Sequence, residues 1–189
     1  WSSDVCSSDL NIHTLIQALA EVRRRHPATH LLIAGRLVDT EYHGELLRLA
    51  HHHGVTEAVT FLGGQEPARL ADLYRECAVF VFPSTVETFG NPLVEAMACG
   101  APIVCSNSAA MPEVAGDAVL YVPPLNHDAM AKAILRVLDE PDLSQQLGRR
   151  ALSQAERYSW EVTAARTAKV LREAARRGGD RKSTRLNSS

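Results

Sequence analysis

Residues 79–100, VFVFPSTVETFGNPLVEAMACG, indicate the architecture of this chain more clearly than any other segment. The segment opens with four apolar, β-prone residues, a run short enough to be a buried parallel strand. It then turns through Phe89-Gly90-Asn91 into a predicted helix, with Asn91 as the N-cap and Pro92 at the first helical position. A strand, a tight turn and a helix in this order are the repeating unit of α/β domains.

Two carboxylates flank this turn. Glu87 lies on the loop beyond the expected strand, and Glu95 lies in the first turns of the expected helix. The backbone N–H groups between them lie at a helix N-terminus, which favours a phosphate. Two carboxylates that accept hydrogen bonds from hydroxyls, placed around an anion site, suit a nucleotide sugar.

Two other interpretations of the acid pair remain open at this point. Glu87 could be an ordinary loop acid and Glu95 a solvated helix acid, because such residues also occur at this spacing. They could also be the two acids of a glycoside hydrolase. The phosphate-type turn between them favours a nucleotide donor over a free glycan.

Helical and strand-like segments alternate along the chain. Apolar residues at helical spacing from Ile12 predict a first helix that ends near Arg25, before Pro27. The expected strands after it are residues 31–35, 58–62, 79–82, 102–105 and 118–122. The expected further helices are residues 41–53, 67–77, 92–99, 128–139, 143–157 and 160–176.

This alternation predicts an α/β fold, a doubly wound, mostly parallel, Rossmann-like sheet with helices on both faces and a single core. Ligands of such sheets bind beyond the carboxyl ends of the strands. The segments that follow the expected strands are Gly35-Arg36, Gly63-Gly64, Ser84–Asn91 and Ser106–Met111. We expect these segments to converge on one crevice.

Charge and cysteine content exclude several classes of protein. The chain has 20 Lys and Arg against 22 Asp and Glu, so nothing indicates a nucleic-acid partner. No apolar run approaches membrane-spanning length. Cys77, Cys99 and Cys105 lack paired spacing, which predicts reduced thiols and a cytoplasmic protein. The basic helix faces at Arg149-Arg150 and 172–177 predict at most peripheral contact at the inner face of the membrane.

The two ends of the chain are related in an unusual way. Residues 1–10, WSSDVCSSDL, can be written in codons whose complementary strand encodes residues 180–188. Unrelated protein segments rarely share this property, and the pair resembles translated sequencing adapter. We therefore expect non-native, adapter-like segments at 1–10 and 180–189, around one nucleotide-sugar-binding, Rossmann-like domain at 11–179.

From about Asn11 to Ala175 the sequence resembles the carboxyl-terminal, donor-binding domain of retaining glycosyltransferases of the GT-B fold, family four. The resemblance rests on the paired-Glu motif and on the residues around it. These read MACGAPIV at 97–104, PEVAGDA at 112–118 and YSW at 158–160.

The resemblance implies roles for the acid-bearing turn. Glu87 would be the catalytic residue, which contacts the transferred sugar and stabilises the positive charge that develops at its anomeric carbon. Glu95 would accept hydrogen bonds from the ribose hydroxyls. The backbone amides of Phe89, Gly90 and Asn91 would line the phosphate and sugar site. The family works without a metal ion or other cofactor, and its donor is a nucleoside diphosphate sugar.

Further substrate-binding residues are expected at Arg36, near the nucleotide, and at Gly64, where the backbone approaches the nucleobase. The family usually supplies an Arg and a Lys for the diphosphate from the segment before Asn11, where this chain has adapter-like residues. We also expect the amino-terminal domain, which would bind a glycan or lipid-linked acceptor, to be absent from this fragment. We therefore expect this fragment to bind nucleotide weakly and to transfer no sugar.

For the parent protein the resemblance implies a hexosyltransferase that moves a hexose from a nucleoside diphosphate to a glycan or lipid hydroxyl. A nucleotide-sugar epimerase of the same fold and a non-catalytic nucleotide-binding module remain alternatives. The run His51-His52-His53 is a weak metal candidate, because consecutive helical residues point about 100° apart. We expect no metal site.

Overall fold

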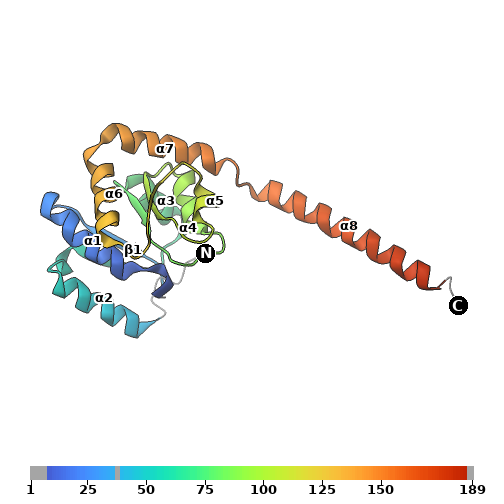
Figure 1. Cartoon of the computed structure of the whole chain (residues 1–189), viewed down its shortest axis with the longest axis horizontal. Helices are drawn as coiled ribbons and strands as arrows, with labels where there is room; N and C mark the ends of the chain where they lie inside the picture. Colours follow the sequence, from blue (N-terminus) through green and yellow to red (C-terminus); the bar gives the residue numbers. More distant parts are fainter. Residues whose placement is uncertain (1–7, 37–38, 187–189) are drawn as a thin grey trace. The chain divides into compact units, whose positions relative to one another are not determined.

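The computed structural model describes residues 8–36 and 39–186, with side chains described through residue 176 (Figure 1). The expected adapter-like segments therefore lie partly outside the described residues. The chain divides into two compact units, Trp1–Ala155 and Glu156–Ser189. We call them the first unit and the second unit and describe each by itself.

Strands and helices alternate through the first unit, as the sequence predicts. The strands are β1 (Leu31–Ala34), β2 (Val59–Gly63), β3 (Phe80–Phe82), β4 (Ile103–Ser106) and β5 (Leu120–Val122). The helices are α1 (Ile12–Arg25), α2 (Thr40–His52), α3 (Pro67–Glu76), α4 (Asn91–Ala98), α5 (Met111–Ala115), α6 (His127–Asp139) and α7 (Pro141–Ala155). Two short 3₁₀ helices are η1 (Ser8–Leu10) and η2 (Thr56–Ala58).

The strands pair in parallel but form two sheets, so the expectation of a single sheet is wrong. The two-stranded sheet pairs β1 with β2, with Leu31 opposite Val59. The three-stranded sheet has the order β3-β4-β5, with Val104 between Val81 and Leu120. Within the described residues no strand lies between β1 and β3, and both strands line a cavity.

Two clusters of buried apolar residues in the described part of the chain share α1, and other buried apolar residues belong to neither. One face of α1, which includes Ile16, packs with Leu46 of α2 and with β1. Another face, which includes Leu15, packs with Met130 of α6 and with Val104 of β4. Helix α1 therefore joins the part of the fold built on β1 and β2 to the part built on β3, β4 and β5. We call these the two-stranded part and the three-stranded part.

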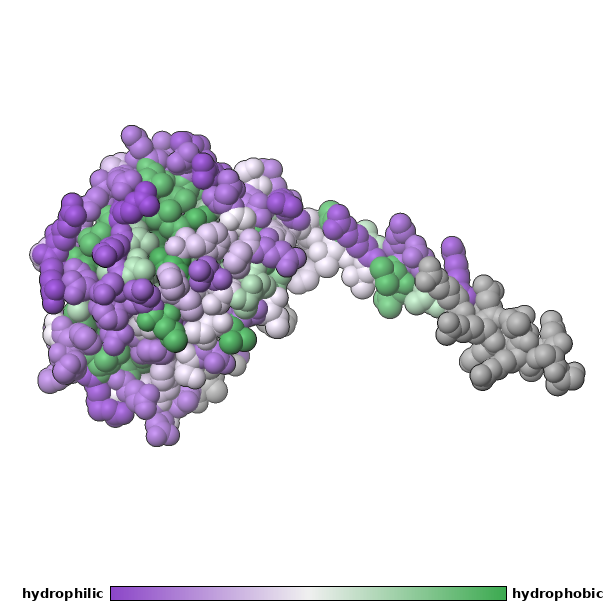
Figure 2. Space-filling model, in the orientation of Figure 1, coloured by the Kyte–Doolittle hydropathy of each residue, from purple (hydrophilic) through white to green (hydrophobic). Residues whose placement is uncertain are grey.

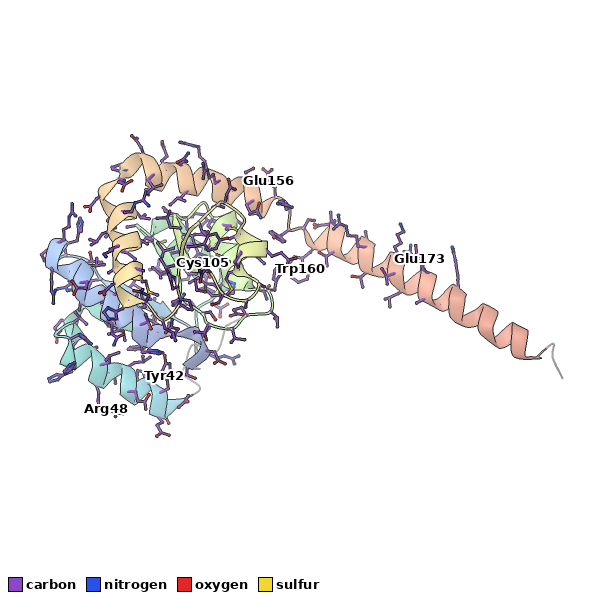
Figure 3. All side chains as sticks on the ribbon, in the orientation of Figure 1. Tyr42, Arg48, Cys105, Glu156, Trp160 and Glu173 are labelled. Carbon is purple, nitrogen blue, oxygen red and sulfur yellow. The ribbon has the colours of Figure 1, made fainter. Side chains whose placement is uncertain are left out.

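The helices contact one another mainly around α1 and α4, and a contact between α6 and α7 links the two sets. Helix α1 packs between α2 and α6, whereas α4 packs with α3, α5 and α7 (Figure 1). Strand β4 has a strand on each side, and all four of its residues are buried. Its Cys105 lies in the interior of the first unit (Figure 3). Cys77, Cys99 and Cys105 are free thiols, as predicted.

Two helices differ from the sequence prediction. Helix α5 has no counterpart among the expected helices, because five residues are too few to show a helical period. Helix α8 (Trp160–Leu186), in the second unit, continues beyond the expected end at residue 176 through the glycine pair at 178–179. Glycine disfavours a helix interior, so this continuation is contrary to local propensity. The exposed apolar side chains of α8 include Trp160 and Val170, and Figure 2 shows apolar patches along it.

Candidate functional site

The turn between β3 and α4 carries the paired acids. Phe82 ends β3, and Asn91 is the first residue of α4. Glu87 lies in this turn and is partly buried, and the loss of hydration raises the pKa of its carboxyl group. A partly desolvated carboxylate gains more from a nearby positive charge than a fully hydrated one, because less water screens the pair.

The N-cap of α4 is Gly90, so the expectation that Asn91 caps this helix is wrong. Gly90 has a φ of 80°, and a Cβ added there would lie 3.2 Å from the ring of Phe82. A left-handed backbone packed against an aromatic ring requires glycine, which places the N-cap one residue before the predicted one. The positive end of the α4 dipole still faces the turn, as the anion-site prediction requires.

Glu95 lies on the first turns of α4, where Tyr74 contacts it. The Tyr74 hydroxyl donates a hydrogen bond to Glu95 Oε2 at 3.3 Å. Tyr74 is buried on α3, with its ring edge-on to Phe80 at a centroid distance of 5.2 Å. Burial and the Glu95 carboxylate raise the pKa of Tyr74, so its hydroxyl remains a donor. Tyr74 therefore fixes one oxygen of Glu95 and leaves the other available.

Arg36 and Gly64 come together at the ends of β1 and β2. A Cβ added at Gly64 would lie 3.1 Å from Cγ of Arg36. The absence of a side chain at Gly64 thus lets the Arg36 stem lie against the backbone of the neighbouring strand end. The sequence predicted both residues for the nucleotide, and the structure brings these two into one place.

A buried polar network ties the strand ends of the three-stranded part together. The Asn11 side-chain amide donates to the carbonyl of Pro83, at 3.0 Å, and to the carbonyl of Pro124. Ser106 Oγ donates to the carbonyl of Ser84 at 2.5 Å. Asn11 is fully buried and has a φ of 57°. Sequence analysis placed Ser84 and Ser106 at this edge but gave Asn11 and Tyr74 no role, because their partners are distant in sequence.

A cavity of about 310 Å³ lies between β1 and β3 and reaches this edge. At the edge its lining includes Ser84 after β3, Glu95 of α4 and Gly35 after β1. Glu87 and the Phe89–Asn91 turn are not among the lining residues. The cavity therefore reaches Glu95, while Glu87 lies on the adjoining turn.

The described part of the chain holds neither a candidate metal cluster nor a candidate membrane-spanning helix. Among residues 8–36 and 39–186, no three His, Cys, Asp or Glu side chains are grouped so that they could hold a metal ion. In the same part of the chain, no helix is both long and apolar enough to span a membrane.

Comparison with known sequences gives a consistent family. The model of the family described as glycosyl transferases group 1 matches residues 6–154. O-antigen chain mannosyltransferase B of Escherichia coli is 37% identical over 159 residues, which cover 80% of this chain and 39% of that protein. Glycogen synthase of Mycobacterium tuberculosis is 33% identical over 178 residues, which cover 93% of this chain and 42% of that protein. The chain thus spans less than half the length of these relatives.

Solved structures agree with the family. Sucrose-phosphate synthase from Thermosynechococcus elongatus has a TM-score of 0.79 and 30% identity, over 89% of this chain and 43% of that chain. HepE of Anabaena, solved in complex with UDP-glucose, has a TM-score of 0.82 and 24% identity, over 88% of this chain and 46% of that chain. The predicted α/β fold, the Rossmann-like C-terminal domain of GT-B enzymes, is confirmed. The relatives named here are transferases and synthases, which supports a transferase over an epimerase.

Proposed function

The chain belongs to the glycosyl transferases of group 1, and we propose that it is the donor-binding domain of a retaining hexosyltransferase. The parent enzyme would move a hexose from a nucleoside diphosphate to a hydroxyl of a glycan or a lipid-linked acceptor. The observation that carries this proposal is the turn–helix segment 84–95, where Glu95 lines a cavity and accepts a hydrogen bond from Tyr74 of α3, and Glu87 lies on the adjoining turn.

In the proposed complex each part of the donor contacts its own structural element. The ribose hydroxyls donate to the Glu95 oxygen that Tyr74 does not hold. The diphosphate lies at the N-terminus of α4, where the amides of the turn and the helix dipole offset its negative charge. Arg36 and Gly64 lie toward the nucleobase. UDP-glucose, the donor in the HepE complex, is a suitable first ligand to test.

Glu87 would act on the transferred sugar. As the bond from the anomeric carbon to the phosphate oxygen breaks, positive charge develops on that carbon, and the Glu87 carboxylate stabilises it. The acceptor oxygen then bonds to the same carbon, and the departing diphosphate takes the electron pair of the broken bond and the acceptor proton. None of the proposed steps requires a metal ion. We place the parent enzyme in the cytoplasm, with any membrane contact peripheral.

The first test is the affinity of this chain for UDP, GDP and ADP by titration calorimetry. We expect one diphosphate to bind with a dissociation constant no weaker than about 1 mM, which corresponds to about 4 kcal/mol. The tightest ligand should then be compared with its 2′,3′-dideoxy analogue. A charged hydrogen bond contributes about 1.5–3 kcal/mol, so the analogue should bind at least about tenfold more weakly.

Substitutions of Glu95 and Glu87 test the proposed contacts with the ribose and with the transferred sugar. In Glu95→Gln the difference in affinity between the nucleotide and its 2′,3′-dideoxy analogue should shrink. Glu140→Gln, at the C-terminal end of α6, is the control and should retain this difference. Glu87→Gln should weaken the nucleotide sugar but leave the free diphosphate unchanged. Binding of none of the three diphosphates, or an unaltered ribose preference in Glu95→Gln, would contradict the proposed function.

A further inference from the structure

The contact between α3 and α4 carries two cysteines beside the hydrogen bond from Tyr74 to Glu95. Cys77 is the C-cap of α3, and Cys99 is the C-cap of α4. The Cys77 amide donates to the carbonyl of Leu73 at 3.1 Å. The Cys99 amide donates to the carbonyl of Glu95, also at 3.1 Å, so both caps continue the helical turn. Because residues three or four apart share a face of a helix, the two cysteines lie one turn beyond the Tyr74–Glu95 pair.

The strands that follow these helices bring the two cysteines to one edge of the three-stranded sheet. β3 begins at Phe80 and β4 begins at Ile103, and these two residues are partners in the parallel pairing. Cys77 and Cys99 precede them by three and four positions. Neighbouring strands lie about 4.8 Å apart. A disulfide joins cysteines whose Cα atoms are about 4.4–6.8 Å apart, so the spacing of the chain at this edge suits one.

The electrostatics of the two helices agree with this geometry. Burial raises the pKa of the Cys77 thiol to about 11, and the charge of Cys99 adds to the increase. Burial and then Glu95 raise the pKa of Tyr74, and Cys99 and Cys77 also contribute. Charges interact appreciably only within about 10 Å at ordinary ionic strength. The two thiols, the tyrosine and the carboxylate therefore form one cluster between α3 and α4.

The two thiols of this cluster are accessible, whereas the third described cysteine is not. Cys77 and Cys99 are partly exposed. Cys105 is buried within β4, where it is paired with Phe82, away from the edge at which the other two lie. An oxidant of low molecular weight would therefore reach Cys77 and Cys99 but not Cys105.

We propose that Cys77 and Cys99 are a thiol–disulfide site, which joins the C-terminal ends of α3 and α4 when the chain meets a low-molecular-weight disulfide such as oxidised glutathione. One thiolate of the pair attacks a sulfur of oxidised glutathione, forms a mixed disulfide and releases one glutathione. The other thiolate then attacks the protein sulfur of the mixed disulfide and releases the second glutathione. The two cysteines are oxidised, the glutathione disulfide is reduced, and the two cysteine protons pass to the two glutathiones.

The disulfide would fix the helix contact that orients Glu95. The bond would lie one turn from the hydrogen bond between Tyr74 and Glu95, and it would close the loop of residues 77–99. Closing this loop restricts the unfolded chain more than the folded one, so the oxidised protein should be the more stable form. Disulfide formation requires no bound nucleotide.

The first test oxidises the complete, folded chain with Cys6 replaced by serine, so that only the three described cysteines can react. The protein is incubated with oxidised glutathione at about pH 8.5, because the thiolate is the reactive form. Free thiols are then blocked, and the chain is cleaved after glutamate. This cleavage separates peptide 77–87, with Cys77, from peptide 96–113, with Cys99 and Cys105. We expect mass spectrometry to find the two peptides linked in most of the chains.

Three further substitutions in this background identify the partners. The link should persist in Cys105→Ser, which is the matched control, and should be absent in Cys77→Ser and in Cys99→Ser. In the last two variants the remaining exposed cysteine should keep a mixed disulfide with glutathione. A link that forms only after unfolding in urea, or that persists in Cys99→Ser because Cys105 takes its place, would overturn the proposal.

The second test asks whether the folded structure accommodates the bond. We expect oxidation to raise the midpoint of urea unfolding, and reduction with dithiothreitol to restore the original midpoint. Cys77→Ser, treated in the same way, is the control and should show no such shift. An unchanged or lower midpoint in the linked chain would show that the native helix contact does not fit the disulfide, and the proposal would be wrong.

Discussion

The two-stranded part and the three-stranded part of the first unit differ in how completely their strands are covered. β4 is buried at every residue, whereas β1 leaves Leu32 50% exposed. In the proposed function, Glu87 and Glu95 belong to the three-stranded part, which contains the fully buried β4, and Arg36 belongs to the two-stranded part. The residues proposed to act on the sugar and ribose therefore lie in the part with the fully buried strand, and α1 joins the proposed nucleobase side to it.

The largest expected effect contrasts one helical glycine from each part. A Cβ added at Gly148 of α7 would lie 2.6 Å from the backbone oxygen of Gly100, so the two elements must move apart. We expect Gly148→Ala to lower the free energy of unfolding by about 2–3 kcal/mol. At Gly44 of α2 the nearest contact is the flexible end of Arg48, at 3.5 Å.

Gly44→Ala is therefore the matched control and should raise stability by about 0.5–1 kcal/mol through helix propensity. Urea unfolding of both variants measures the difference. If both substitutions have the same sign, the two parts are equally well packed and the comparison fails.

A second, smaller effect is expected at Asn11, which links the strand ends of the three-stranded part. Asn11→Ala leaves the carbonyls of Pro83 and Pro124 without this donor and should cost about 1–3 kcal/mol. Asn11→Gly removes the same amide but suits the φ of 57°, so it should lose less. Thermal unfolding of the pair separates side-chain loss from backbone strain. Wild-type stability in Asn11→Gly would show that the hydrogen bonds contribute nothing.

The smallest effect is a pH dependence at Glu87. Desolvation raises the pKa of this carboxyl in the folded state, so the folded protein holds its proton more tightly than the unfolded chain does. The associated stability is complete below the ordinary pKa and is lost as pH rises through the raised value. Glu87→Gln should therefore be more stable than wild type at pH 7 and equal to it below about pH 4.

Urea midpoints from pH 3.5 to 8 check this prediction. Glu173→Gln, on the exposed surface of α8, is the control and should follow the wild-type profile. A Glu87→Gln profile that tracks wild type at every pH would show that Glu87 is as well hydrated as a surface acid.

The order of strands and helices could be predicted from sequence because its signals are local. The apolar run at 79–82, the glycines after the strands and the prolines at helix starts each act within a few residues. The sheet pairing could not be predicted in this way, because the period of a strand does not identify its neighbour. The single-sheet expectation failed there, since β1 and β3 have no described strand between them.

The candidate site was predictable to a similar degree. The Glu87–Glu95 pair stands out because both acids lie in one strand–turn–helix unit. Asn11 and Tyr74 escaped prediction because their hydrogen-bond partners are distant, with Pro83 lying 72 residues from Asn11 and Glu95 lying 21 residues from Tyr74. The Asn91 cap was predicted wrongly because the contact between Gly90 and the ring of Phe82 is tertiary.

We propose that one donor site spans the strand ends of both parts. Amide hydrogen exchange of the whole chain, with and without a saturating concentration of the tightest-binding nucleoside diphosphate, tests it most directly. A shared site should slow exchange in residues 84–95 and, in the same experiment, around Arg36 and Gly64. Protection confined to one part, or located away from both strand ends, would contradict it.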